Sequence, residues 1–294
     1  MVVTPAPSAP PAPRRVTGLP DPGRCLVMGI LNVTPDSFSD GGAFFDTARA
    51  IDRGLALAAD GADIVDVGGE STRPGAHPVP LEEELARVLP VVGELARSGA
   101  FVSIDTMHAT IARAAVDAGA RLVNDVSGGL ADPLMTDLVA TAGVPYVATH
   151  WRAPSRVMKH HAVYTDVVAD VVDELRQRLG HLLAAGIGED QILIDPGLGF
   201  AKRPAHDWTL LAHLDRLHAL GFPVLIGASR KSFIGALLGA GDPACVPPAA
   251  RDTATTAISA LAATAGAHCV RVHDVRSSLD AVRVAAAWTT PPRP

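Results

Sequence analysis

The sequence is short of aromatic residues and of cysteine, and both shortages narrow the possibilities. Phe, Trp and Tyr make up 4% of the 294 residues, so a core must be built from Ala, Val, Leu and Ile. The three cysteines, Cys25, Cys245 and Cys269, are odd in number and widely spaced, which indicates neither a disulfide framework nor a zinc site. We interpret Cys25 and Cys269, which lie in or beside apolar runs, as packing residues. This usage is typical of a reducing cytoplasm, where we expect the protein to reside.

A basic excess and a long apolar run are also missing. The formal net charge of -6 argues against a nucleic-acid partner, although a local cluster of cations could still bind a phosphorylated small molecule. No apolar run reaches the roughly 18 residues of a membrane span, so we expect no membrane partner. Residues 1–22 are rich in Pro and Ala, and no apolar stretch follows Arg14 and Arg15 before Pro20. These residues therefore predict a disordered tail rather than an export signal.

The rest of the chain alternates between two patterns. Short runs rich in Val, Ile and Leu, each ending in polar residues or glycine, are typical of buried parallel strands. They lie at residues 25–33, 62–68, 101–105, 121–126, 146–150, 192–195, 224–228 and 269–273. Stretches with helical spacing separate them, at residues 46–60, 81–98, 109–118, 133–142, 164–185, 207–220, 231–238 and 251–265. Several of these stretches are followed by a glycine suited to a helix C-cap.

This alternation predicts an α/β protein with a single closed (β/α)8 TIM barrel over residues 23–288 and a frayed end at 289–294. Such a barrel typically needs about 250 residues, and the 48% apolar content supplies a sizeable core. An open doubly wound sheet is the alternative. The first predicted strand lacks a G-x-G-x-x-G turn, which weakens a dinucleotide-binding fold.

Polar groups follow every predicted strand. Enzymes with this fold place their catalytic groups at the C-terminal ends of the strands, so these groups should share one rim. A single such residue is usually a helix cap, but a full ring indicates a ligand site. The ring contains Asn32, Asp66, Glu70, Asp105, Asn124, Asp125, His150, Asp195, Ser229, Arg230, Lys231, Arg271 and His273.

The acids and amides of this ring indicate a flat, nitrogen-rich heterocycle. Asp105, Asn124 and Asp195 can accept hydrogen bonds from it and donate to it. A carboxylate matches an N–H beside an exocyclic amino group as a two-point pair, which is strong and directional.

The cations of the ring indicate a phosphate. Arg271 and His273 are two residues apart, so on a strand they share one face. Together with Lys231 they could clamp a phosphate and stabilise the charge on a leaving diphosphate, and an arginine can also stack on a flat ring. The alternative for Arg271 and His273 is a structural pair bonded to Asp274 or to neighbouring carboxylates.

Long loops follow the first two predicted strands, at residues 35–42 and 70–75. They hold glycine with small and charged residues, and we interpret them as mobile lids that exclude water on closure. Solvated surface turns are the alternative. A third loop, at residues 195–200, contains two glycines that let the backbone approach a ligand closely.

The chain resembles dihydropteroate synthase of folate biosynthesis from about residue 25 to residue 288. Seven segments carry the resemblance in the order of the family: MGILNVTPDSFSDG at 28–41, GADIVDVGGESTRP at 61–74, SIDT at 103–106, NDVSGG at 124–129, DPGLGF at 195–200, GASRK at 227–231 and RVHD at 271–274. The resemblance implies a transferase that joins 4-aminobenzoate to a dihydropterin and releases diphosphate in an SN1-like step. It also implies a homodimer and inhibition by sulfonamides.

The resemblance implies a role for each site residue. The pterin would be bound by Asp105, Asn124, Asp195, Phe200, Lys231 and Arg271. The diphosphate would be bound by Asn32, Arg271 and His273, with Mg²⁺ on Asn32. The 4-aminobenzoate would be bound by Ser37, Phe38, Thr72, Arg73, Pro74 and Ser232. The catalytic residues would be Asp105, Lys231, Arg271 and His273.

The chain departs from the family pattern in two places, and two alternative functions remain. Thr149 stands where many members carry Met, and the segment 151–164, with His160 and His161, does not align; we expect a solvated loop there rather than a metal site. The rivals are a pterin-binding methyltransferase and an inactive pterin-binding paralogue. The Ser-Arg-Lys run at 229–231 and the Thr-Arg-Pro run at 72–74 favour the active synthase.

Overall fold

Eight parallel strands form a barrel, as predicted. The structure is a computed structural model that describes residues 15–34, 43–71 and 79–290. The strands are β1 (Leu26–Asn32), β2 (Ile64–Gly68), β3 (Val102–Asp105), β4 (Leu122–Asp125), β5 (Tyr146–Thr149), β6 (Ile192–Asp195), β7 (Leu225–Ile226) and β8 (Cys269–Val272). They pair in the order β6-β5-β4-β3-β2-β1-β8-β7. A parallel bridge between Ile194 and Val224 joins the two ends of this sheet, so the barrel closes.

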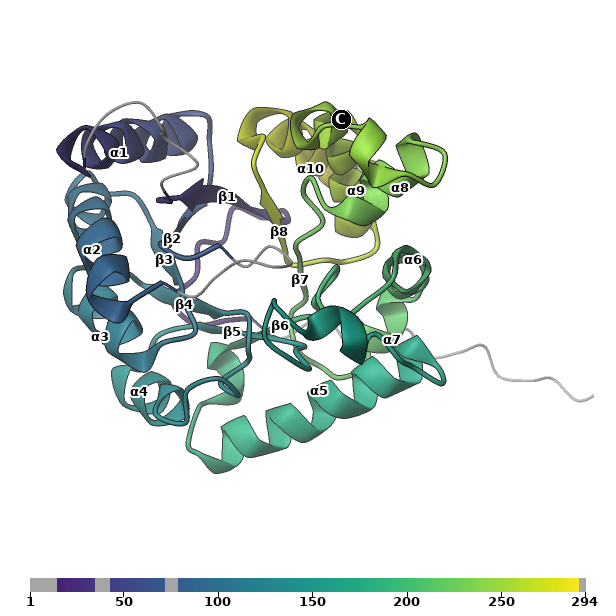
Figure 1. Ribbon diagram of the computed structural model, residues 1–294, viewed down its shortest axis with the longest axis horizontal. Coiled ribbons are helices and arrows are strands. Elements are labelled where there is room, and N and C mark those ends of the chain that lie inside the picture. Colours follow the sequence, from purple (N-terminus) through teal and green to yellow (C-terminus); the bar gives the residue numbers. More distant parts are fainter. Residues whose placement is uncertain (1–14, 35–42, 72–78, 291–294) are drawn as a thin grey trace, which may run out of the picture.

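The helices lie round the outside of the strands (Figure 1). They are α1 (Ala43–Ala59), α2 (Leu81–Arg97), α3 (Ala109–Asp117), α4 (Met135–Ala142), α5 (Val167–Ala184), α6 (Pro204–Ala212), α7 (Leu214–His218), α8 (Ser232–Leu238), α9 (Asp252–Thr264) and α10 (Val275–Thr289). Among the described residues, no helix has the length and apolar content needed to cross a membrane.

Two helical assignments differ from the sequence prediction. The expected helix at 207–220 is two helices, because the backbone leaves the helical region at His213. The last helix, α10, lies beyond the stretches with predicted helical spacing. The side chain of Asp274 caps it by accepting from the backbone N–H of Ser277 at 3.2 Å. Val275, Leu279 and Val282 are buried along one face of α10, at the spacing that a packed helix requires.

The strands alternate between two apolar layers. Val27, Val65 and Val102 face the helices in the outer core. Their neighbours Met28 and Ile64 belong to a separate cluster with the other inward-facing residues of the barrel floor, Leu26, Leu122, Val147, Leu193, Leu225 and Cys269. Because side chains alternate along a strand, the residues two and four positions further along point inward near the C-terminal ends. This period-two pattern is what brings the predicted rim residues together.

Packing of the chain begins before residue 23, where the barrel domain was predicted to start. Val16 is 7% exposed and joins the cluster of the barrel floor, with Leu19 packed against it. The hydroxyl of Thr17 donates to a carboxylate oxygen of Asp190 at 2.6 Å, and its backbone N–H donates to the Asp190 carbonyl at 2.8 Å. Residues 16–19 therefore pack against the barrel floor, and the predicted tail is packed at this end.

The cysteines are free, as predicted. Cys269 is buried within the barrel floor, and Cys25 is half-buried against the outer core. Burial raises the pKa of the Cys25 thiol to about 12. Both cysteines are therefore packing residues.

Candidate active site

A cavity of 490 Å³ opens at the C-terminal ends of the strands. Its wall includes seven of the predicted site residues, which come from different strands and loops: Asn32, Asp105, Phe200, Lys231, Ser232, Arg271 and His273. Asn124 and Asp195 are 3% and 6% exposed and adjoin residues of this wall, Asn124 through Asp66 and Asp195 beside Gly227. The larger part of the predicted rim therefore gathers at one cavity.

Arg271 is the centre of this site. Its Nε donates to Oδ2 of Asp66 and its Nη2 donates to Oδ2 of Asp105, each at 2.6 Å. The side chain of Asn124 donates to the same Oδ2 of Asp66 at 2.9 Å. Arg271 thus lines the cavity while two carboxylates hold its guanidinium in place.

These contacts bear on the alternative role of Arg271, that of a residue bonded structurally to Asp274 or to neighbouring carboxylates. The side chain pairs with neighbouring carboxylates, as that alternative allowed, but it also reaches the cavity. Asp274 instead caps α10. Arg271 is therefore both paired with carboxylates and part of the cavity wall.

The charges on Arg271 and Asp105 depend on each other. Burial raises the pKa of Asp105 to about 7, against the opposing effect of Arg271, and the nearby Asp66 raises it further. Burial opposes the charge on Arg271, but Asp66 and Asp105 outweigh it and raise the pKa of the guanidinium. Arg271 is therefore a permanent cation, while Asp105 can change its protonation state near neutral pH.

Lys231 and Asp195 lie beside Gly227, which is part of the wall of the same cavity. A Cβ at Gly227 would lie 3.5 Å from Oδ2 of Asp195 and 3.9 Å from Nζ of Lys231. Burial lowers the pKa of Lys231 and raises that of Asp195, and each residue counteracts the shift of the other. Lys231 also donates to the Leu198 carbonyl, and its Nζ lies 4.7 Å from the centre of the Phe200 ring.

His273 and Asn32 complete the wall. Nδ1 of His273 lies 2.8 Å from the hydroxyl of Ser229, which also accepts the backbone N–H of His273 at 3.1 Å. These two contacts fix the orientation of the imidazole. Asn32, at the end of β1, lines the same cavity, and Ser232 lies in the first turn of α8 beside Lys231.

Five of the predicted 4-aminobenzoate residues lie outside the described residues. They are Ser37, Phe38, Thr72, Arg73 and Pro74, from the two predicted lid loops. Their assignment stays a prediction. Ser232 is the described member of that set, and it lies on the cavity wall.

Sequence reasoning missed three contributors to the site. Asp66 was placed on the rim but received no role, although it is fully buried and holds both Arg271 and Asn124. The segment 151–164 was expected to be a solvated loop, and Lys159, His160 and His161 are indeed exposed. The same segment also places the buried Met158 on the cavity wall. An apolar Met beside polar neighbours was the only signal for it.

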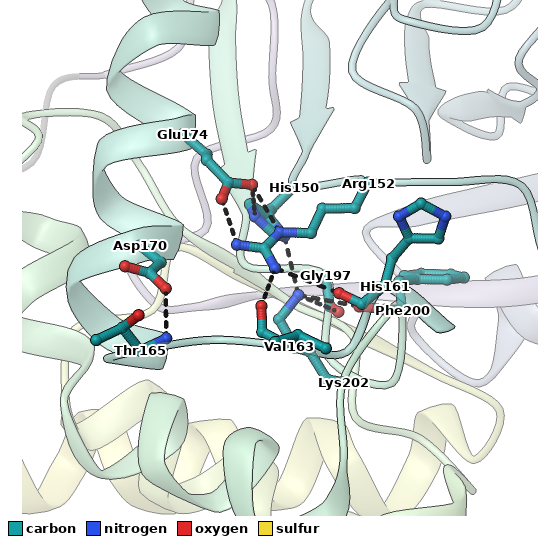
Figure 2. A network of polar contacts seen from close by, with 10 residues as sticks. All are labelled: His150, Arg152, His161, Val163, Thr165, Asp170, Glu174, Gly197, Phe200 and Lys202. Atoms are coloured by element: carbon teal, nitrogen blue, oxygen red, sulfur yellow. Dashed lines mark hydrogen bonds and ion pairs between the residues drawn. The ribbon is translucent and has the colours of Figure 1, made fainter. Parts of the chain in front are cut away.

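The third missed contributor is the polar network in Figure 2. Nε2 of His150 lies 2.9 Å from a carboxylate oxygen of Glu174 on α5, and Nδ1 lies 2.9 Å from Nζ of Lys202. The guanidinium of Arg152 donates to both carboxylate oxygens of Glu174. Burial lowers the pKa of His150 to about 4, and Lys202 lowers it further. The imidazole is therefore neutral at neutral pH.

One further group offers ligand atoms for a cation. Among the described residues, Glu70, Glu84 and His108 bring such atoms within 4.8 Å of one another. Glu84 is fully buried and accepts a hydrogen bond from the hydroxyl of Thr106 at 2.9 Å. Burial raises the pKa of Glu84, which favours its uncharged form and weakens it as a metal ligand.

Comparison with known proteins agrees with this geometry. The family model for pterin binding enzymes matches residues 28–273. The chain is 56% identical over 263 residues to the dihydropteroate synthase of Mycobacterium leprae, covering 89% of this chain and 93% of that protein. Two solved structures are also similar. The Xanthomonas albilineans dihydropteroate synthase with 4-aminobenzoic acid has a TM-score of 0.83, is 46% identical and covers 92% of this chain and 94% of its own. The Yersinia pestis dihydropteroate synthase with a sulfonamide drug complex has a TM-score of 0.85, is 40% identical and covers 93% of this chain and 98% of its own.

The barrel and its polar mouth define a pterin-binding TIM-barrel enzyme. Within that class, the chain belongs to the dihydropteroate synthase family. The resemblance noted in the sequence is thereby confirmed.

The buried His150 predicts a loss of stability in acid. Its ordinary pKa is 6.5 and its pKa in the folded protein is about 4, so between these values the unfolded chain binds the extra proton. Stability must then fall as the pH drops from 6.5 toward 4, by up to ~3 kcal/mol. Urea unfolding at pH 7 and pH 4.5 would measure this. A His150→Asn variant should lose clearly less stability between the two pH values than the parent protein, and an equal loss in both would contradict the assignment.

Proposed function

We propose that this protein condenses 6-hydroxymethyl-7,8-dihydropterin diphosphate with 4-aminobenzoate to give 7,8-dihydropteroate and diphosphate. The observation that carries this proposal is the shared cavity wall, which combines carboxylates for a pterin with cations for a diphosphate. Membership of the dihydropteroate synthase family supports it. A sulfonamide is bound in the Yersinia pestis relative, and sulfonamides should inhibit this protein as well.

The pterin binds at the base of the cavity. Asp105 and Asp195 accept hydrogen bonds from ring N–H and amino groups, and Asn124 offers an amide held by Asp66. Lys231 and Arg271 complete the polar contacts, and Phe200 packs beside the ring at the level of the Lys231 ammonium. Each of these groups lies at the end of a strand or on a short loop that the barrel holds rigidly.

The diphosphate leaves toward Arg271 and His273. The bond between the pterin methylene carbon and the diphosphate oxygen breaks, and its electron pair departs with the oxygen. Cationic donors that are already in position stabilise this developing charge without reorganisation. The lone pair of the 4-aminobenzoate nitrogen then forms the new C–N bond, and this nitrogen releases one proton.

Asn32 is the residue that we propose for Mg²⁺. Magnesium binds through few protein ligands and otherwise through phosphate oxygens and waters. A single amide oxygen on the cavity wall, on the same wall as Arg271 and His273, fits that requirement. When bound, the ion neutralises charge on the diphosphate.

The 4-aminobenzoate enters beside the two loops that follow β1 and β2. We assign its binding to Ser37, Phe38, Thr72, Arg73, Pro74 and Ser232. Its carboxylate meets Ser232 in the first turn of α8, where backbone N–H groups point at an anion.

We propose that the protein is a cytoplasmic homodimer. The helices α9 and α10 lie side by side (Figure 1), and both expose large apolar side chains. Leu261 is 71% exposed, Val284 64% and Trp288 80%. A second copy that packs on these helices would cover them, and the mass of the protein in solution, measured by light scattering, tests this.

The proposed reaction is tested by following diphosphate. With pterin diphosphate and Mg²⁺ present, we expect rapid diphosphate release and dihydropteroate formation only when 4-aminobenzoate is added. Transfer of a methyl group from separately added methyltetrahydrofolate, without diphosphate release, would instead favour the methyltransferase. Tight pterin binding without turnover would favour the inactive paralogue and overturn the proposal.

A further inference from the structure

Lys202 lies behind the substrate cavity and makes three contacts. Its Nζ lies 2.9 Å from Nδ1 of His150, 3.0 Å from the carbonyl oxygen of Gly197 and 3.1 Å from that of Phe200. An ammonium group can donate three hydrogen bonds, and here each of them has an acceptor. Lys202 is not among the residues that line the cavity.

The two partners of the His150 ring, Lys202 at Nδ1 and Glu174 at Nε2, determine its tautomer. Because Lys202 donates to Nδ1, the imidazole proton lies on Nε2 and is donated to Glu174. Arg152 holds Glu174 in turn, and its Nη1 also donates to the Val163 carbonyl at 2.6 Å (Figure 2). A continuous chain of hydrogen bonds therefore runs from α5 to the loop after β6.

That loop carries groups that face the substrate. The carbonyl of Leu198 accepts from Lys231, and the Phe200 ring lies beside the same ammonium. Both residues line the cavity. Any movement of the loop would therefore move Lys231 and the aromatic wall of the pterin site.

The loop needs support from outside itself. Gly197, Gly199 and Ala201 have φ values of 66°, 77° and 47°, all in the left-handed region. Alanine adopts that region only at a cost, of about 1 kcal/mol or more, so neighbouring contacts must hold it there. A Cβ at Gly197 would lie 2.2 Å from the carbonyl oxygen of His150, which shows how closely the loop packs against the end of β5.

We propose that Lys202 is a positioning residue for the reaction. Its ammonium fixes the carbonyls of Gly197 and Phe200, and so places Leu198 and Phe200 against Lys231. Glu174 and Arg152 orient the imidazole of His150, which accepts the third hydrogen bond from Lys202. The effect on catalysis rests on the proposed function, whereas the effect on the loop does not.

The test replaces Lys202 with methionine, which keeps the length of the side chain and removes its donors. Lys159→Met is the matched control, because Lys159 is exposed. We expect amide hydrogen exchange at residues 197–201 to quicken by about tenfold or more, with strand amides unchanged. The KM for pterin diphosphate should rise by about tenfold, with a smaller change in kcat, and the control should match the parent protein.

A role in stability alone would give another result. The melting temperature would fall, while loop exchange and KM stayed within about twofold of the parent values, and that outcome overturns the proposal. If Lys202→Met does not fold, Glu174→Gln provides the second variant, with a smaller change in the same two readouts expected. If the parent protein releases no diphosphate, the proposed function fails, and the exchange measurement still decides the role of Lys202.

Discussion

Replacing Arg271 with alanine is expected to lower kcat/KM by at least about 10³-fold, because one charged donor alone is worth about 10²- to 10³-fold in a preorganised site. Arg271 also orients Asp105, with which it shares a 2.6 Å hydrogen bond. On the proposed function, the substitution removes the cation assigned to the diphosphate and releases the acid assigned to the pterin. Steady-state kinetics with both substrates measures this loss.

Loss of stability must be separated from loss of chemistry. Arg271→Ala leaves Asp66 and Asp105 buried without their cation, which costs about 3–5 kcal/mol in comparable cases. The double variant Arg271→Ala with Asp66→Asn removes one of these charges and should recover part of the stability. Activity should stay as low as in the single variant. Recovery of activity together with stability would show that Arg271 acts only through folding.

The sequence predicts the barrel well because two patterns alternate along the chain: short apolar runs for the strands and stretches with helical spacing. Inward-facing residues alternate along each strand, and this brings Asp105, Asn124 and Asp195 to one mouth without knowledge of the packing. The same rule places Asp66 inside, two residues before Gly68, and a stricter use of it would have assigned that acid a role. This omission was therefore avoidable.

The network round Lys202 has no such signal. His150, Glu174 and Lys202 are 24 and 28 residues apart along the chain and belong to different elements. Their contacts depend on side-chain length and on the path of the loop after β6, neither of which is periodic. Met158 also lies on the cavity wall, and it comes from a segment without a periodic pattern. Such contacts become visible only once the three-dimensional arrangement is known.

Asp105→Asn is the second substitution with a large expected effect. The amide keeps the shape of the side chain but cannot accept a two-point pair from the N–H and amino groups of a pterin, and it loses the charge partner of Arg271. We expect kcat/KM for pterin diphosphate to fall by about 10²-fold or more. Asp117→Asn, an exposed acid at the end of the following helix, is the control and should leave activity unchanged.

The pH profile distinguishes the proposed role of Asp105 from a general loss of structure. Its pKa of about 7 means that the carboxylate is protonated below neutral pH and ionised above it. If the ionised form binds the pterin, kcat/KM of the parent protein should rise about tenfold per pH unit below pH 7 and level off above it. The Asp105→Asn variant should be flat over this limb, because the titrating group is gone. A variant that keeps the rising limb, or that retains activity within threefold of the parent (~0.6 kcal/mol), would show that Asp105 is not the acid that recognises the pterin.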